Sequence, residues 1–206
     1  NNVINQHIDV CIVNAGPGTG KTTTACEKAY KLIDEGVIFL SYTNAAVKED
    51  MNRMYVYPNL SKNISCNNMD KMIVFKTVDS IASFINRGIS ETYDHNIRDA
   101  INNLKNNNNS FKQKHIIVDE AQDIDDLRCE LISVLFNKCN FKSITILGDP
   151  RQKINMNYGN WYKNLCIDSK DGCVKFNGTT YLSNYIGITI TYRFKNEEIC
   201  TLVSNL

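Results

Sequence analysis

Two acidic residues and a glycine-rich segment carry the clearest chemical signal in this sequence. Asp119 and Glu120 directly follow His115–Val118, an apolar run typical of a buried strand. Far upstream, a second apolar run at Val10–Asn14 leads into a segment that holds three glycines. Each feature alone is a weak sign. Together, and each at the end of a predicted strand, they indicate Mg²⁺-assisted hydrolysis of a nucleoside triphosphate.

The glycine-rich segment matches a phosphate-binding loop, although the strict pattern has Gly where Ala15 stands. Glycines let backbone N–H groups approach phosphate oxygens, and the predicted helix 22–32 adds the positive end of its dipole. Lys21 would reach the β- and γ-phosphates, and the Thr22 hydroxyl would bind Mg²⁺. The predicted nucleotide-binding residues are Gly16, Pro17, Gly18, Thr19, Gly20, Lys21 and Thr22.

The two carboxylates have different predicted roles. In parallel sheets, ligands bind at the carboxyl ends of the strands, so Asp119 is placed to hold Mg²⁺ beside the loop. Glu120 is the candidate base that orients and deprotonates the attacking water. The next acidic residues, Asp123, Asp125 and Asp126, are better explained as the acidic first turn of a helix.

Strand and helix patterns alternate from Val10 to about Gly148, which predicts an α/β fold with a parallel sheet and helices on both faces. A helix over 122–136 would cover the sheet with a stripe of Leu and Ile. Near the carboxyl end, Asn177-Gly178 predicts the turn of a small β-hairpin, interpreted as a surface elaboration. At 206 residues, the chain can bury one full α/β core.

Six motifs in one order resemble the first RecA-like motor domain of a superfamily 1 helicase, a P-loop NTPase. They are the phosphate loop, Thr43–Ala46, Lys76–Ser80, Asp119–Asp123, Ile144–Gln152 and Thr191–Arg193. The resemblance implies that Gln152 contacts the γ-phosphate and that Arg193 neutralises its charge. It also implies that single-stranded nucleic acid is bound, with contacts from Thr43, Asn44, Thr77 and Ser80.

The chain also departs from the family pattern. The large domain that UvrD/Rep-type members insert before the carboxylates is missing, as it is in superfamily 1 helicases of RNA viruses. The base-stacking aromatic after Gln152 is replaced by Asn155, and Tyr158 and Trp161 are the candidate substitutes. The Asp119–Asp123 motif favours the DNA helicases, so we expect a DNA track and keep RNA as the alternative.

The motifs predict a RecA-like ATP-binding domain over residues 1–190. Residues 191–206 would be the start of a second RecA-like domain, which would be the partner of the first. This predicts that the chain is part of a larger protein. Gln6 is the candidate contact to the base, and the choice between ATP and other nucleotides stays open.

Composition narrows the remaining possibilities. With 23 basic and 22 acidic residues the net charge is +1, which argues against tight electrostatic binding of a duplex. Eight cysteines form no Cys-x-x-Cys pair, so we expect free thiols and no zinc. No apolar run is long enough to span a membrane, and a soluble, intracellular protein is expected.

Three functions fit these observations, in descending order. The first is a helicase motor domain, weak or inactive alone. The second is an RNA helicase domain of a viral replication polyprotein. The third, of another class, is a nucleotide-gated binding module without motor activity.

Overall fold

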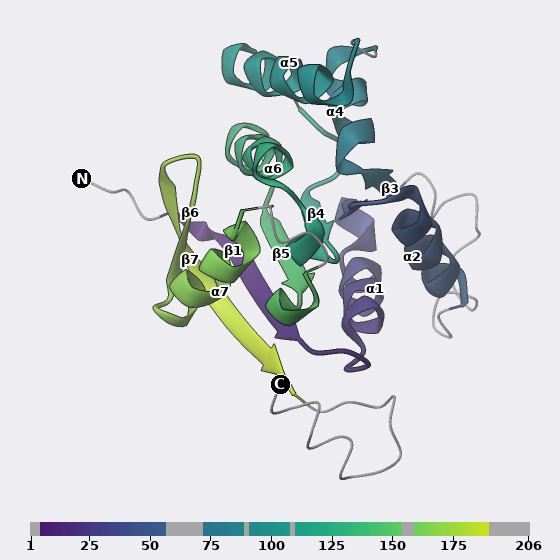
Figure 1. Ribbon diagram of the computed structural model, residues 1–206, viewed down its shortest axis with the longest axis vertical. Coiled ribbons are helices and arrows are strands. Elements are labelled where there is room, and N and C mark those ends of the chain that lie inside the picture. The colour runs from purple at the N-terminus through teal and green to yellow at the C-terminus, as the bar shows by residue number, and fades with distance from the viewer. Residues whose placement is uncertain (1–4, 57–71, 89–90, 108–109, 154–158, 190–206) are drawn as a thin grey trace.

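The computed structural model describes five stretches of the chain, shown in colour in Figure 1: residues 5–56, 72–88, 91–107, 110–153 and 159–189. The predicted boundary at residue 190, together with Arg193, lies outside the described residues. So do Asn155 and Tyr158.

A seven-stranded sheet forms the centre of the described structure. Its order is β3-β2-β4-β5-β1-β7-β6, and every neighbouring pair is parallel except β6 and β7. The strands are β1 (Asn5–Ala15), β2 (Val37–Ser41), β3 (Ile73–Thr77), β4 (His115–Val118), β5 (Ser143–Gly148), β6 (Cys173–Phe176) and β7 (Thr179–Ile188). The inner strands are apolar runs because both of their faces are covered, as parallel sheets require.

Helices pack on both faces of this sheet (Figure 1). The helices are α1 (Lys21–Lys31), α2 (Asn44–Val56), α4 (Val78–Asn86), α5 (Tyr93–Asn106), α6 (Asp126–Lys138) and α7 (Trp161–Lys170). Alternate residues of β1 divide between two cores. Val10 and Ile12 face the cluster of α4, α5, α6 and α7, whereas Cys11 and Val13 face α1. The predicted α/β architecture is confirmed.

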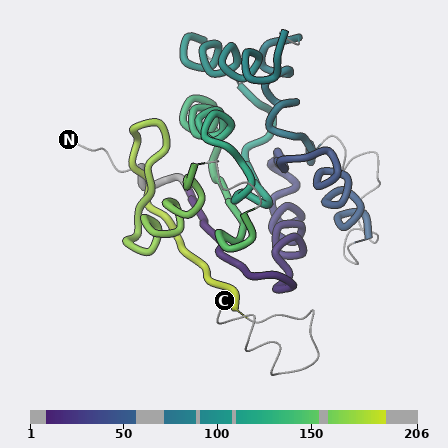
Figure 2. The backbone as a smooth tube through the Cα atoms, viewed as in Figure 1, coloured from purple at the N-terminus to yellow at the C-terminus, as the bar shows by residue number. Residues whose placement is uncertain are grey.

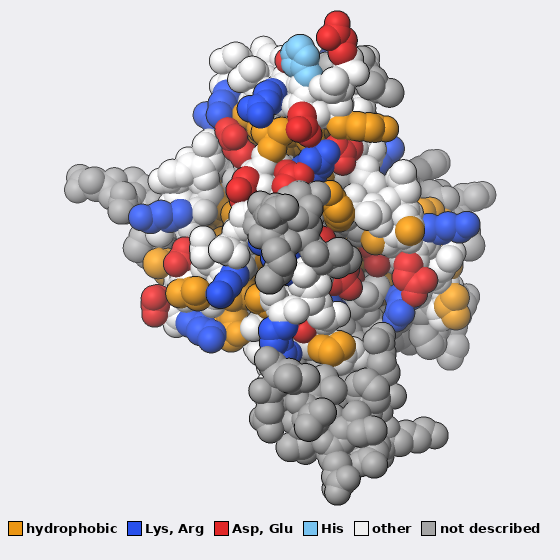
Figure 3. Space-filling model, viewed as in Figure 1, with side chains coloured by type: hydrophobic (Ala, Val, Ile, Leu, Met, Phe, Trp, Pro, Cys, Tyr) orange, Lys and Arg blue, Asp and Glu red, His pale blue; other side chains and the backbone are white. Residues whose placement is uncertain are grey.

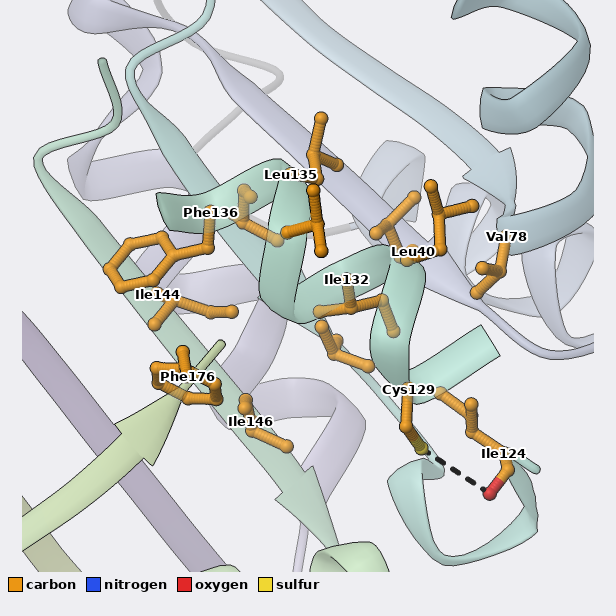
Figure 4. Close-up of a cluster of buried hydrophobic side chains, with 14 of the residues drawn as sticks. Leu40, Val78, Ile124, Cys129, Ile132, Leu135, Phe136, Ile144, Ile146 and Phe176 are labelled. Atoms are coloured by element: carbon orange, nitrogen blue, oxygen red, sulfur yellow. Dashed lines mark hydrogen bonds between the residues drawn. The ribbon is translucent and has the colours of Figure 1, made fainter. Parts of the chain in front are cut away.

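Helix α6 is buried nearly all round, which the sequence did not indicate. Ile132 and Leu135 lie among Ile144 and Ile146 of β5 in Figure 4, and α5 packs on α6 from the other side. The predicted start at Gln122 is wrong by four residues. A short 3₁₀ turn, Ala121–Asp123, comes first, and the Asp125 side chain then caps α6 by accepting the N–H of Arg128 at 2.9 Å.

The predicted hairpin is present, with Asn177 and Gly178 in left-handed conformations between β6 and β7. Its interpretation as a surface elaboration is wrong, because β7 continues to Ile188 and pairs in parallel with β1. Phe176 and Tyr181 are fully buried in the main core. Figure 2 shows the purple β1 beside the yellow end of the described chain. The carboxyl-terminal part of the described chain thus completes the central sheet.

Candidate nucleotide-binding and hydrolysis site

The glycine-rich segment forms a tight loop between β1 and α1, at the lower end of the coloured part of Figure 1. Gly18 and Gly20 have φ of 69° and 86°, which side chains with a Cβ rarely adopt. The Thr19 hydroxyl donates to the Gly16 carbonyl at 2.8 Å and so closes the loop on itself. Ala15 ends β1 with its methyl group buried in the core, so the departure from the strict pattern serves packing.

Lys21 and Thr22 begin α1 directly after this loop, one residue before the predicted start at Thr22. Lys21 is 8% exposed although it carries a charge. A nearly buried ammonium at the first turn of a helix, beside backbone N–H groups, gives a strongly positive site. A phosphate group is the ligand that such a site favours.

Thr22 and Asp119, 97 residues apart in sequence, are in direct contact. The Thr22 hydroxyl donates to Oδ2 of Asp119 at 2.9 Å. Asp119 is 1% exposed, and its backbone N–H donates to Leu40, which extends the pairing of β4 with β2. Burial raises the pKa of Asp119, and the neighbouring Glu120 adds to the rise. The hydrogen bond from Thr22 and the charge of Lys21 act in the opposite direction.

The residues at this contact suit Mg²⁺. Mg²⁺ takes oxygen ligands and keeps several waters, so a protein commonly supplies one or two groups and the phosphates supply more. The Asp119 carboxylate and the Thr22 hydroxyl are two such oxygens, side by side at the phosphate loop. They would hold the ion.

Glu120 lies next to this contact in an unusual backbone conformation, with φ of 51° and ψ of 43°. Left-handed backbone costs a non-glycine residue about 1 kcal/mol, so its neighbours must hold it in place. Its carboxylate accepts a hydrogen bond from the Gln122 amide at 2.8 Å, and its backbone N–H donates to Asp119 at 2.9 Å.

Gln122 connects Glu120 to the segment that follows β5. Its side chain is buried, its Nε2 donates to Glu120, and its Oε1 accepts the backbone N–H of Asp149 at 3.0 Å. In the sequence alone, Gln122 has no role of its own and is only one residue of the Asp119–Asp123 motif. The available signal was its position two residues after Glu120, because a single turn brings such a side chain back to the carboxylate.

Gln152, the predicted contact to the γ-phosphate, lies in a 3₁₀ turn (Pro150–Gln152) after β5. Its amide donates to Oδ2 of Asp149 at 2.8 Å, and Arg151 donates to Oδ1 through its backbone and through Nε. Asp149 is completely buried. Burial opposes its charge, but the hydrogen bonds from Gln152 and Arg151 prevail and hold its pKa below the ordinary value. Asp149 therefore anchors this turn as an anion.

Gly148, the last residue of β5, sits where three segments meet. A Cβ there would lie 2.6 Å from Oε1 of Gln122 and 2.9 Å from the Tyr162 ring. The buried Tyr162 hydroxyl is within hydrogen-bonding distance of the carbonyls of Val13 and Gly148, at 2.6 and 3.0 Å. Tyr162 thereby ties the end of β1 to the end of β5.

The predicted nucleic-acid contacts lie at the same edge of the sheet as the phosphate loop, after the neighbouring strands β2 and β3. Thr43 and Asn44 are exposed at the start of α2, and the Thr43 hydroxyl accepts the N–H of Ala46. Thr77 caps α4 by accepting the N–H of Ser80 at 3.1 Å. Capping at the start of a helix accounts for a threonine at both positions. Their contacts with nucleic acid stay a prediction.

Two further predicted residues are placed less favourably. Gln6 lies near the beginning of β1, whereas the phosphate loop follows the end of that strand. Nine strand residues span about 30 Å, so this placement gives the predicted contact between Gln6 and the base no support. Trp161 begins α7 and packs partly against the core.

The chain matches the family model of the AAA domain, AAA_19, over residues 2–157. The chain belongs to the AAA_19 family. This is a P-loop NTPase family found in UvrD/Rep-like helicases, and the match includes the phosphate loop, the carboxylates and Gln152. The structure agrees with a RecA-like P-loop NTPase fold. A search of curated proteins found no match.

The AAA_19 match ends before α7, β6 and β7, yet these elements complete the same sheet and core. Six cysteines in the described stretches are free thiols, and five of them are buried. In the same stretches, no helix combines the length and apolar character that crossing a membrane requires.

Proposed function

We propose that this chain is the ATP-hydrolysing motor domain of a superfamily 1 helicase that moves along single-stranded nucleic acid, DNA rather than RNA. The contact of Thr22 with Asp119 carries the proposal, because it joins the phosphate loop to the carboxylate motif at 2.9 Å. Backbone N–H groups of the loop and Lys21 would bind the phosphates, and Asp119 with Thr22 would hold Mg²⁺.

Hydrolysis then depends on Glu120. Mg²⁺, when bound, neutralises charge on the phosphate oxygens. Glu120 would orient a water molecule and accept its proton as the water oxygen attacks the γ-phosphorus. The bond to the β–γ bridging oxygen breaks, and ADP leaves. The hydrogen bond from Gln122 holds the Glu120 carboxylate in place for this step.

The proposed track for the strand runs over the ends of β2 and β3. The exposed side chains of Thr43 and Asn44 and the partly exposed Ser80 offer neutral polar groups there, and Thr77 would reach the strand once its hydroxyl is released from capping α4. Figure 3 shows basic and acidic side chains interspersed over one face of the molecule, so a broad basic patch does not dominate that face. Neutral contacts to the backbone of a single strand suit this charge pattern. In the intact protein, a second RecA-like domain with Arg193 at its start would close over the nucleotide.

A viral RNA helicase is the second candidate, and one observation favours it. The interval between Thr77 and Asp119 holds α4 and α5, which pack on each other and on α6 and belong to the main core. These helices occupy the place of the large insertion that DNA helicases of the UvrD/Rep type carry.

Steady-state hydrolysis of ATP by the intact protein tests these proposals. The rate is measured without polymer, with single-stranded DNA and with single-stranded RNA of equal length. Glu120→Gln removes the base, and Glu130→Gln makes the same change at an exposed position of α6. We expect stimulation by DNA that Glu120→Gln abolishes and Glu130→Gln preserves. Stimulation by RNA alone would favour the viral candidate. Binding of nucleotide without any turnover would overturn the motor and leave a nucleotide-gated module.

A further inference from the structure

The turn after β5 lies directly against the phosphate loop. A Cβ built on Gly16 would be 2.9 Å from Nη2 of Arg151 and 4.0 Å from Oδ2 of Asp149. The guanidinium of Arg151 therefore occupies the space beside the loop backbone where a side chain at position 16 would extend. Glycine at 16 leaves room for this cation.

We propose that Arg151 binds the γ-phosphate of the nucleotide that the loop holds, an inference that rests on the proposed function. Among the described residues, the only hydrogen-bond partner of its side chain is Asp149, reached through Nε at 3.1 Å. The two terminal nitrogens remain to donate. A guanidinium offers several donors in a planar fork that matches phosphate oxygens.

The γ-phosphate is the assigned target because of the network behind Arg151. Asp149 holds Arg151 and also bonds through its backbone to Gln122, which in turn holds Glu120. The base acts on the water that attacks the γ-phosphorus. Arg151 belongs to the same hydrogen-bond network as the base and therefore lies on the side of the loop where we expect the γ-phosphate.

A simpler role for Arg151 is to neutralise the buried Asp149, with no contact to the nucleotide. The side chain of Arg151 is 42% exposed, and a cation that served only Asp149 would have no need to reach the loop. The two roles differ in what they predict for nucleotides with and without a γ-phosphate. Loss of a purely structural cation would weaken the binding of both nucleotides alike.

The test compares dissociation constants for ADP and for a non-hydrolysable ATP analogue, each with Mg²⁺, by calorimetry. Arg151→Ala should weaken binding of the analogue about tenfold and binding of ADP less than about twofold, the loss expected for one charge-assisted hydrogen bond. Arg151→Lys keeps the charge without the planar fork and should recover only part of the loss. Lys175→Ala removes a cation from exposed β6 and should change neither constant.

The outcomes separate the two proposals. Equal weakening of both nucleotides by Arg151→Ala, or no weakening, would overturn the γ-phosphate contact and leave nucleotide binding intact. A wild-type chain that binds ADP and the analogue equally well would do the same. A wild-type chain that binds neither nucleotide would overturn the proposed function together with this inference.

Discussion

Glu120 has a strained backbone conformation, and its carboxylate is positioned by the buried side chain of Gln122, a dependence that can be measured. Gln122→Met keeps the length of the side chain and removes its three hydrogen bonds, with Glu120, Asp123 and Asp149. We expect the rate of ATP hydrolysis to fall about 10- to 100-fold, which is the cost of one or two misplaced hydrogen bonds at the reacting centre.

Nucleotide affinity should stay within about threefold, less than about 1 kcal/mol, because the hydrogen bonds of the Gln122 side chain run to Glu120, Asp123 and Asp149 rather than to the loop or Lys21. Single-turnover rates and equilibrium binding, measured on the same preparations, separate the two effects. A parallel loss of affinity would show that Gln122 supports the loop rather than the base.

Asp50 is a buried carboxyl group near the site that the mechanism does not use. Burial raises its pKa from 3.8 to about 7, and the charges of Asp119 and Glu120 add to the rise, whereas a hydrogen bond from Ser41 opposes it. Between about pH 4 and 7 the folded protein therefore retains a proton on Asp50 that the unfolded chain has already released. Stability from this group is complete below pH 4 and is lost as the pH rises through 7.

Asp50→Asn removes this dependence, because the amide does not titrate. The unfolding free energy of the wild type should fall relative to that of the variant by a few kcal/mol as the pH rises from about 4 to 8, because only the wild type has a carboxyl group at this position that must stay protonated in the folded state. Urea unfolding at several pH values measures this difference. A constant difference across the range would show that Asp50 is ionised in the folded state at all these pH values.

At the scale of elements, Arg128 of α6 holds three neighbouring segments together. It makes two hydrogen bonds with Asp79 of α4, at 2.6 and 3.1 Å, bonds Asp125, and lies 3.5 Å from Asp94 of α5. Burial works against its charge, but Asp79 and Asp125 raise its pKa above the ordinary value.

The two carboxylates beside Arg128 form a matched pair for a stability test. Asp79→Asn breaks a two-bond contact whose partners are mostly buried, and should lower the unfolding free energy by about 1–3 kcal/mol. Asp94 is 66% exposed, so Asp94→Asn should cost less than about 0.5 kcal/mol. Chemical denaturation measures both. Equal costs would mean that Arg128 does not depend on Asp79.

The sequence predicted the elements whose signal is local. Strands β2 and β4 are continuous apolar runs, and the loop after β1 carries glycines that its backbone angles require. Two features escaped prediction because they depend on distant partners. The polar residues of β7 look like a surface hairpin until β1 pairs with it, and the second face of α6 looks exposed until α5 covers it.

The candidate site divides in the same way. Thr22, Asp119 and Glu120 were predicted because residue type and place after a strand are both local signals. The bonds of Gln122 with Asp149, and the contact of Arg151 with the loop, join segments that only the sheet order brings together. No spacing in the sequence encodes them.

At the scale of the whole molecule, the β6–β7 hairpin is bound to the core by aromatic residues. Phe176 is completely buried against Phe136 and Tyr181, with ring centroids 5.4 and 5.8 Å away. Phe176→Ala should lower the unfolding free energy by about 3–5 kcal/mol, the usual cost of such a cavity. Leu182→Ala, at a position 46% exposed, should cost less than about 1 kcal/mol.

Thermal and urea unfolding of the two variants give these values. If Phe176→Ala unfolded in two separate transitions, the hairpin would be an independent unit. A single transition at lower stability is expected, since the hairpin shares its core with α6 and β5.

The position of β1 between β5 and β7 has a consequence for biosynthesis. The strand that carries the phosphate loop is made well before its partners, which lie at residues 143–148 and 179–188. During translation one edge of β1 stays unpaired until β5 has been made, and the other edge stays unpaired until β7 has been made. An unpaired apolar strand is prone to aggregate, and chaperones bind such exposed segments. Pairing between strands that lie this far apart in the sequence also slows folding. The nucleotide site is thus among the last parts of the domain to form, and a nascent chain that ends before β7 has yet to complete it.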